Sequence, residues 1–300
     1  MPVKPDRLKP GDLIGVCSPA GPVEEEELRP GIKALESLGF RVSLSPHCLR
    51  KKAYLAGGDE LRLKDLHGLF QDEKVKAIVC ARGGYGSLRL FDRVDFDLIR
   101  RRPKILVGYS DITALLLAIY RRAHLVTIHG PVLRDLTKNQ GLNLGFLTKL
   151  LTSRESVTIR FEGAKALRKG TAEGKLLGGN LSLITHLLGT PFIPSLQGAL
   201  LFLEERGEAP YRIDRMLTHL RLSGLLNTCA GIMTGSFEDC GGPSTVEALI
   251  KERLGDLPLP VMIGLPVGHG EVNTALPIGV KAILDTRQKT LTLREACVKA

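Results

Sequence analysis

Residues 103–112, with the sequence PKILVGYSDI, decide the fold of this chain. The apolar run 105–107 predicts a buried strand that ends at Gly108, and a helix is expected to begin directly after Ser110. A strand, a sharp turn and a helix in this order are typical of open α/β sheets, which bind ligands at the carboxyl ends of their strands. The sequence therefore places Ser110 where a ligand site is expected.

The same alternation continues on both sides of this stretch. From residue 12 to about residue 132, short β-branched runs alternate with helical patterns, which is typical of a doubly wound parallel sheet. Strands are expected at 13–17, 41–44, 76–80, 104–107 and 125–128, and helices at 24–38, 58–70 and 111–122.

A change of character around residues 153–174 predicts a domain boundary, because the sequence there becomes polar and interrupted, like surface loops between short strands. We expect an α/β protein: an N-terminal doubly wound parallel sheet flanked by helices (residues 1–160), then a smaller C-terminal α+β domain (residues 161–300). The second part is expected to have strands at 199–203, 231–234 and 261–264, helices at 180–188, 213–222 and 245–254, and a hairpin at 279–294.

Composition excludes several classes of protein. With 300 residues, 43% hydrophobic and 25% charged, the chain can bury large cores, which excludes a disordered or collagen-like protein. The net charge of +10 comes from dispersed basic residues, and aromatic residues make up only 5% with no tryptophan, so no nucleic-acid partner is expected. No apolar segment has the length of a signal peptide or a membrane span, which favours a cytoplasmic protein without a membrane partner.

The six cysteines form no C-x-x-C pair, and several lie in apolar runs, so they are expected to be reduced core thiols. Metal ligands do not occur at short helical spacing such as H-E-x-x-H either. Neither a metal site nor a cofactor is expected.

Ser110 has two possible roles. The Gly108-Tyr109-Ser110 segment resembles half of the hydrolase nucleophile elbow, in which a helix N-terminus faces the developing oxyanion, although Ile112 replaces the second glycine of G-x-S-x-G. Alternatively, Ser110 is the N-cap of the helix, with Asp111 favouring the helix dipole in the first turn.

A nucleophilic serine needs a base and an acid that orients it. His129 and His269 each follow an expected strand and enter a Gly/Pro loop, so either could be the base, and either could be structural. Glu204 closes an apolar strand, where a carboxylate needs a donor such as an imidazole N–H. A capping or ion-pair role for Glu204 is the alternative.

Residues 81–87, with the sequence ARGGYGS, follow the expected strand that ends at Cys80. Glycines there allow close backbone approach, and their N–H groups can bind an anion or an oxyanion. The G-x-G-x-x-G spacing of dinucleotide-binding loops is not met, so an oxyanion role ranks above a phosphate site.

Together these motifs resemble the LD-carboxypeptidase family of serine peptidases, also called the muramoyltetrapeptide carboxypeptidase or S66 family. The resemblance runs almost end to end. Its motifs are Gly15-Val16-Cys17-Ser18-Pro19-Ala20, Arg82-Gly83-Gly84-Tyr85-Gly86, Gly108-Tyr109-Ser110-Asp111, His129-Gly130-Pro131, Gly178-Gly179-Asn180-Leu181, Leu203-Glu204-Glu205 with Tyr211-Arg212-Ile213-Asp214-Arg215-Met216-Leu217, and Gly264-Leu265-Pro266-Val267-Gly268-His269.

The resemblance implies a Ser-His-Glu triad of Ser110, His269 and Glu204, with no cofactor. Family members typically have aspartate in place of Glu205, so which of the two adjacent glutamates faces His269 is left to the structure. The backbone N–H groups of Gly84 and Asp111 are expected to form the oxyanion hole.

The resemblance also implies the substrate. It is a cytoplasmic murein tetrapeptide, from which the enzyme releases terminal D-alanine during peptidoglycan recycling, and a homodimer is expected. We further expect Arg82 to bind the free carboxylate of the leaving residue, an interdomain ion pair being the alternative. Two other functions remain: a microcin C immunity-type peptidase acting on aminoacyl-nucleotides, whose adenine recognition is linked to an aromatic platform, and a non-catalytic anion- or nucleotide-binding module.

Overall fold

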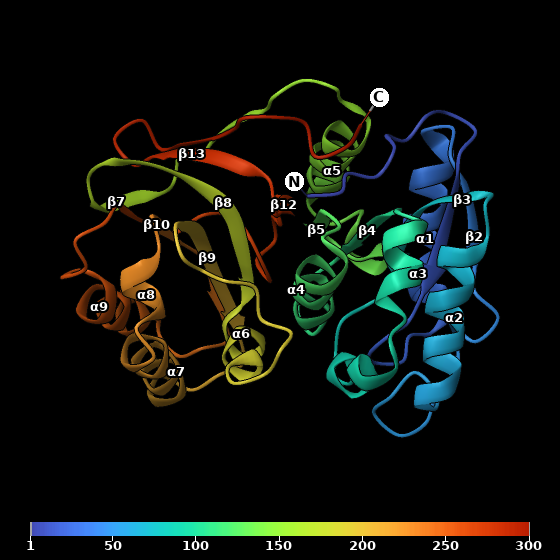
Figure 1. Ribbon diagram of the computed structural model, residues 1–300, viewed down its shortest axis with the longest axis horizontal. Coiled ribbons are helices and arrows are strands. Elements are labelled where there is room, and N and C mark those ends of the chain that lie inside the picture. Colours follow the sequence, from blue (N-terminus) through green and yellow to red (C-terminus); the bar gives the residue numbers. More distant parts are fainter. Residues whose placement is uncertain (1, 300) are drawn as a thin grey trace.

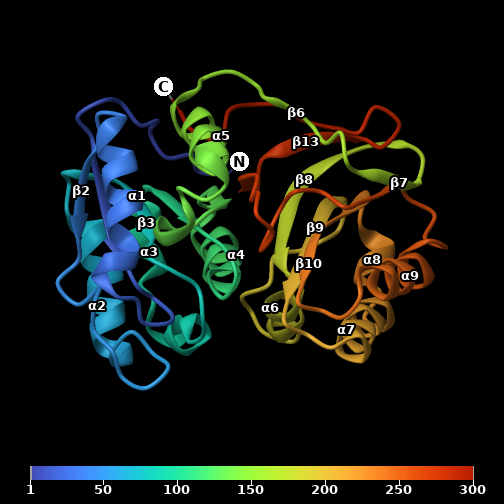
Figure 2. The same cartoon turned by 180° about the vertical axis from the view of Figure 1, so that it is seen from behind.

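The computed structural model describes residues 2–299 and contains two β-sheets flanked by helices. In Figure 1 the N-terminal part (blue to green) and the C-terminal part (yellow to red) lie side by side, and helix α4 (Ile112–Ala123) lies between them. Figure 2 shows the same arrangement from behind, with both chain ends near α5 (Leu142–Thr152). The two-part α/β class expected from the sequence is confirmed.

The first sheet has six strands in the order β12-β5-β4-β3-β1-β2, and all but β12 run parallel to their neighbours. Its elements from the N-terminal part are β1 (Leu13–Cys17), α1 (Glu25–Ser37), β2 (Arg41–Leu44), α2 (Asp59–Gln71), β3 (Val75–Cys80), α3 (Phe96–Arg101), β4 (Ile105–Gly108), α4 and β5 (Thr127–His129). The strands and helices α1, α2 and α4 agree with the expected elements to within a few residues, whereas α3 was not predicted. Strand β12 (Leu276–Ile278) comes from the C-terminal part and pairs antiparallel with β5, which the sequence did not predict.

The second sheet has eight strands in the order β6-β14-β13-β8-β9-β10-β11-β7. Four parallel strands, β8 to β11, form its centre, and antiparallel strands flank them. Its elements are β6 (Thr158–Arg160), β7 (Lys165–Arg168), β8 (Thr171–Asn180), α6 (Leu181–Leu187), β9 (Ala199–Arg206), α7 (Pro210–Leu222), α8 (Leu225–Thr228), β10 (Gly231–Glu238), α9 (Pro243–Leu254), β11 (Val261–Ile263), β13 (Lys281–Asp285) and β14 (Thr290–Leu293). The expected hairpin is formed by β13 and β14, whereas β8 begins within the stretch expected to be loops. The domain boundary at residue 160 stays a prediction.

The two parts meet at the start of helix α4. Gly179 has a φ of +133°, and a Cβ there would lie 2.5 Å from Cγ2 of Thr113, so only glycine lets the end of β8 approach the helix. The N–H of Asn180 donates to Oγ1 of Thr113 at 3.1 Å. This contact holds the first turn of α4, and with it Ser110, against the second sheet.

The cysteines are free and buried, as expected for core thiols. Burial raises the pKa of Cys229 and Cys297 to about 12, which keeps both thiols protonated at neutral pH. Of the helices in the described part of the chain, none combines the length and apolar character needed to cross a bilayer.

Candidate active site

Ser110 occupies a strained turn between β4 and α4. Its φ is +63°, a left-handed conformation that non-glycine residues seldom adopt and that typically marks a functional site. The N-cap of α4 is Asp111, and within residues 2–299 the Ser110 hydroxyl caps no N–H of the first turn. The geometry therefore matches the strand-turn-helix corner of a nucleophile elbow and not the capping alternative.

The glycine loop that follows β3 lies directly against this serine. A Cβ on Gly83 would come within 2.7 Å of the Ser110 Cβ and 2.9 Å of its Oγ. The carbonyl of Gly83 accepts the N–H of Gly21 at 3.0 Å, which fixes the loop. Asp111 anchors its far end, because its buried carboxylate accepts the N–H of Ser87 at 2.8 Å.

Two backbone N–H groups remain available beside Ser110. Neither Gly84 nor Asp111 donates its N–H to another group of the described chain, and both residues line the same pocket. Gly84 has a φ of +111°, a conformation that glycine adopts readily and other residues seldom adopt. These are the two donors that the sequence predicts for an oxyanion hole.

Glu204 is the carboxylate that meets His269. It lies in β9 with no exposed surface, and its Oε2 is 2.6 Å from Nδ1 of His269. Glu205 points elsewhere, since its carboxylate accepts bonds from the Asn180 amide at 2.9 Å and the Ser182 hydroxyl at 2.7 Å. The acid next to His269 is thus Glu204, whereas the carboxylate of Glu205, also in β9, binds residues at the start of α6.

The electrostatics of Glu204 reflect both burial and its neighbours. Burial raises the pKa of this carboxyl, but the imidazoles of His129 and His269 outweigh burial and bring the pKa down to about 2. The carboxylate is therefore ionised at neutral pH and can only accept a hydrogen bond. Hence Nδ1 of His269 carries the proton, and its Nε2 is free to accept one.

The loop after β11 holds His269 in place. The N–H of Gly268 donates to the Asn273 side chain at 3.0 Å, and the N–H of Gly270 donates to the Ser236 hydroxyl at 3.0 Å. Gly268 has a φ of +107°, and a Cβ there would lie 2.5 Å from Oε2 of Glu204. The centroid of the His269 ring lies 4.8 Å from that of Tyr109, the residue that precedes Ser110.

A pocket of about 340 Å³ joins these groups. Five of the predicted site residues line it: Arg82, Gly84, Ser110, Asp111 and His269. Glu204 lies behind His269 and does not line the pocket, and His129, the other candidate base, is fully buried beside Glu204.

Polar residues that the sequence did not assign also line this pocket: Arg134, Asp135, Asn180, Ser182, Arg206 and Glu208. Asn180 belongs to the Gly178-Gly179-Asn180-Leu181 motif, which was a signal for it, whereas nothing in the sequence pointed to Arg134 or Asp135.

Arg82 lies at the side of the pocket with its charge unpaired by any carboxylate of residues 2–299. Its Nη1 donates to the carbonyl of Pro22 at 2.8 Å. The interdomain ion pair considered from the sequence is absent from the described part of the chain. The guanidinium is partly exposed and remains able to bind an anion.

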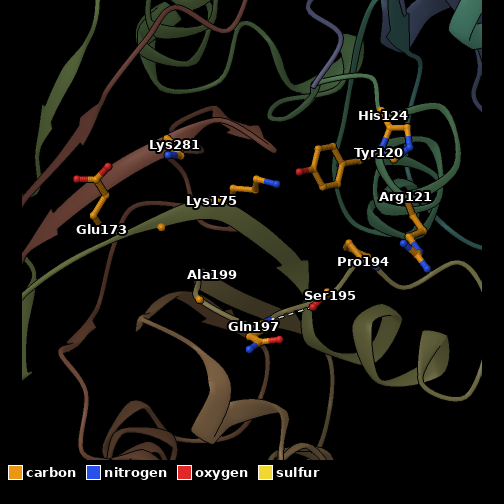
Figure 3. A pocket seen from close by; sticks show the side chains of 12 residues that line it. Tyr120, Arg121, His124, Glu173, Lys175, Pro194, Ser195, Gln197, Ala199 and Lys281 are labelled. Atoms are coloured by element: carbon orange, nitrogen blue, oxygen red, sulfur yellow. Dashed lines mark hydrogen bonds between the residues drawn. The ribbon is translucent and has the colours of Figure 1, made fainter. Parts of the chain in front are cut away.

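A larger hollow of about 700 Å³ lies elsewhere and contains none of the predicted site residues. Its lining includes Tyr120, Arg121, Lys175 and Lys281, and Figure 3 shows Tyr120 and Lys175 pointing toward one another across it. The lining contains one serine, Ser195, whose hydroxyl accepts the N–H of Gln197 at 3.4 Å. His124 and Glu173 also line this hollow, but in residues 2–299 no hydrogen bond joins their side chains to each other or to Ser195. The smaller pocket is therefore the candidate active site.

Comparison with known proteins supports the resemblance of the sequence to the LD-carboxypeptidase family. Residues 14–130 match the model of the LD-carboxypeptidase N-terminal domain, and residues 173–284 match that of the LD-carboxypeptidase C-terminal domain. A probable murein peptide carboxypeptidase of Bacillus subtilis is 40% identical, over 97% of this chain and 94% of that protein. A murein tetrapeptide carboxypeptidase of Pseudomonas aeruginosa is 32% identical, over 91% of this chain and 92% of that protein.

The fold is also known from solved structures. The crystal structure of an MccF-like protein from Bacillus anthracis superimposes with a TM-score of 0.90 at 30% sequence identity, covering 97% of this chain and 99% of that one. Two family models, matched in order along most of the sequence, and relatives that share its length lead to one assignment. The chain belongs to the LD-carboxypeptidase family of peptidases, known as S66.

Proposed function

We propose that the chain is a serine carboxypeptidase that hydrolyses the L,D-peptide bond of cytoplasmic murein tetrapeptides and releases the terminal D-alanine. The observation that carries the proposal is the convergence of Ser110 and His269 on one pocket, with Glu204 bonded to His269 at 2.6 Å. The murein tetrapeptide carboxypeptidase among the relatives supports this substrate class.

The first chemical step is attack by Ser110. Nε2 of His269 takes the hydroxyl proton as Oγ attacks the carbonyl carbon of the scissile bond. Glu204 holds the imidazole through Nδ1 and stabilises the imidazolium that forms. A serine at its ordinary pKa is a poor nucleophile, so this pair supplies the activation.

The oxyanion of the tetrahedral intermediate lies between the N–H groups of Gly84 and Asp111. Such preorganised donors contribute on the order of several kcal/mol in comparable sites. The imidazolium then gives its proton to the leaving amine of D-alanine, and water, activated by the same histidine, releases the acyl group from Ser110.

Arg82 binds the free carboxylate of the leaving residue. It lines the pocket beside Gly84, and no carboxylate of the described chain neutralises it. A guanidinium can make two parallel hydrogen bonds to a carboxylate, which would favour a C-terminal residue over an internal one. The domain division at residue 160 and a homodimer are part of this proposal.

The second candidate function is hydrolysis of an aminoacyl-nucleotide, which the similarity to the MccF-like protein favours. The chain has no tryptophan to stack on a base. Tyr85, however, directly follows Gly84, is 52% exposed, and packs edge-on against the exposed Tyr54 at 5.5 Å. A pair of tyrosines at this place could bind an adenine ring.

A substrate comparison tests the proposal. The enzyme is incubated with three compounds: an L,D-tetrapeptide that ends in D-alanine, its L,L isomer, and an aminoacyl-nucleotide in which a cleavable amide-type bond joins the amino acid to the nucleotide. The released amino acid is measured. We expect release from the L,D-peptide only. Release from the nucleotide alone would replace the first candidate by the second, and release from neither, with tight binding, would indicate a binding module.

A further inference from the structure

The carboxylate of Glu204 is approached by two imidazoles, one at each oxygen. Oε2 bonds to Nδ1 of His269 at 2.6 Å, and Oε1 lies 3.9 Å from Nε2 of His129. Both Glu204 and His129 have no exposed surface. Across residues 2–299, Oε1 and both ring nitrogens of His129 have no hydrogen-bond partner at standard distance.

The surroundings of His129 are otherwise apolar or aromatic. Its ring packs edge-on against the rings of Phe202 and Tyr109, with distances between ring centroids of 5.1 Å and 6.1 Å, respectively. A buried imidazole without a partner costs free energy that a phenylalanine or leucine in the same place would not cost. Since Glu204 Oε1 is likewise unpartnered and faces Nε2, each group is the natural partner of the other.

The pair also connects the two parts of the molecule. His129 ends β5 in the first sheet, whose neighbouring strand β4 leads to Ser110, and Glu204 lies in β9 of the second sheet. Any change in the spacing of the sheets would alter the Nε2 to Oε1 distance. It would alter the position of Glu204 and His269 relative to Ser110 as well.

We propose that His129 is a positioning residue of the active site: in the working enzyme its Nε2–H donates to Oε1 of Glu204, and this bond orients the carboxylate toward His269. The inference rests on the proposed function, since it assigns Glu204 the role of acid. A movement of about 1 Å brings the two atoms to hydrogen-bond distance, and catalytic hydrogen bonds are often long before substrate is bound.

Among the ionisable groups around Glu204 and His129, His269 is the one that we expect to respond to a bond between them, because the others have partners of their own. The Tyr109 hydroxyl donates to Asp135 at 2.7 Å and is therefore not directed at Glu204. Asp135 is in turn 3.7 Å from Nε of Arg134. Without the His129 N–H, the carboxylate is less well stabilised and holds the proton of the adjacent imidazolium more firmly.

Two variants of equal length separate the N–H donor from simple packing. His129→Gln retains an N–H near the position of Nε2, and His129→Met has the same chain length with no donor. With the L,D-tetrapeptide, we expect His129→Met to lower kcat roughly 10- to 100-fold with KM changed less than about 2-fold. The acidic limb of its kcat/KM profile should move to higher pH, and His129→Gln should restore both properties.

Equal loss in His129→Met and His129→Gln, or an unshifted acidic limb in the methionine variant, would overturn the assignment, because packing alone would then explain the residue. If His129→Met does not fold, His129→Phe, which retains a ring without a donor, takes its place in the comparison. Failure of the parent enzyme to release D-alanine would instead refute the proposed function. In that case acid unfolding still tests the pair: loss of stability should begin at higher pH in the donorless variant than in His129→Gln.

Discussion

Oε2 of Glu204 lies 2.6 Å from Nδ1 of His269, although 65 positions separate the two residues along the chain. The contact forms because Glu204, near the end of β9, meets the loop after β11, and because Gly268 has no Cβ that would meet the carboxylate. A buried, ionised acid on an imidazole is the arrangement that makes a nearby serine hydroxyl reactive.

Separate replacement of each of the two adjacent glutamates by glutamine tests which of them is the acid. Glu204→Gln should lower kcat on the order of 10⁴-fold, because an amide cannot stabilise the imidazolium. Glu205→Gln is the matched control, since its amide can still contact Asn180 and Ser182, and kcat should fall less than about 10-fold. Steady-state kinetics on the tetrapeptide gives both values. A larger loss in Glu205→Gln would exchange the roles of the two residues.

Replacement of Gly83 tests whether the glycine loop positions Ser110. In Gly83→Ala the new Cβ would lie 2.7 Å from the Ser110 Cβ, so the serine or the loop must move. We expect kcat/KM to fall on the order of 10²-fold, because small displacements of a reacting group have effects of that size. The control is Gly68→Ala in helix α2, where a Cβ meets nothing within 4 Å. Equal activity of the two variants would contradict the proposed close fit.

Arg82→Ala tests recognition of the substrate carboxylate. We expect kcat/KM to fall about 10- to 100-fold on the peptide acid, as for loss of a charge-assisted bond, and much less on the C-terminal amide. Arg134→Ala is the comparison, because Arg134 lines the same pocket but lies 3.4 Å from Glu27 and 3.7 Å from Asp135. If Arg82→Ala affected acid and amide equally, the carboxylate role would be wrong.

The pKa of Glu204 predicts a loss of stability in acid. Its folded-state pKa of about 2 lies below the ordinary glutamate value of 4.5, so its stabilising contribution is complete above pH 4.5 and is lost as the pH falls toward 2. The free energy involved is on the order of a few kcal/mol. Chemical unfolding between pH 5 and 2 should show a steeper loss in the parent than in Glu204→Gln. Burial raises the pKa of Glu205, so that residue contributes in the opposite direction.

Much of the fold could be predicted from the sequence because the central strands are continuous apolar runs that end at glycine or at a turn. The run 105–107 before Gly108 is the clearest case, and β4 with α4 follows it as expected. The place of β12 could not be predicted, because three residues far along the chain pair with β5 through tertiary packing. The extent of β8 was missed because its first half alternates exposed and partly buried residues, as an edge or loop would.

The candidate site was predictable where reactive residues lie near the end of a strand, as Glu204 does, or in the turn or loop after it, as Ser110 and His269 do. Side-chain direction was not, because neighbours on a strand point to opposite faces and the sequence does not reveal which face meets His269. Arg134 and Asp135 were missed because they lie in a short 3₁₀ turn, Leu133–Asp135, that follows the His129-Gly130-Pro131 motif and is not itself part of a motif.

The most direct test of the central claim, that Ser110 is the nucleophile, compares D-alanine release by the parent enzyme and Ser110→Ala. Thermal unfolding and tetrapeptide binding are measured on both proteins, to show that the variant is folded and still binds. The account predicts a loss of turnover of about 10⁶-fold with binding retained. Turnover by the folded variant within 10-fold of the parent would contradict it.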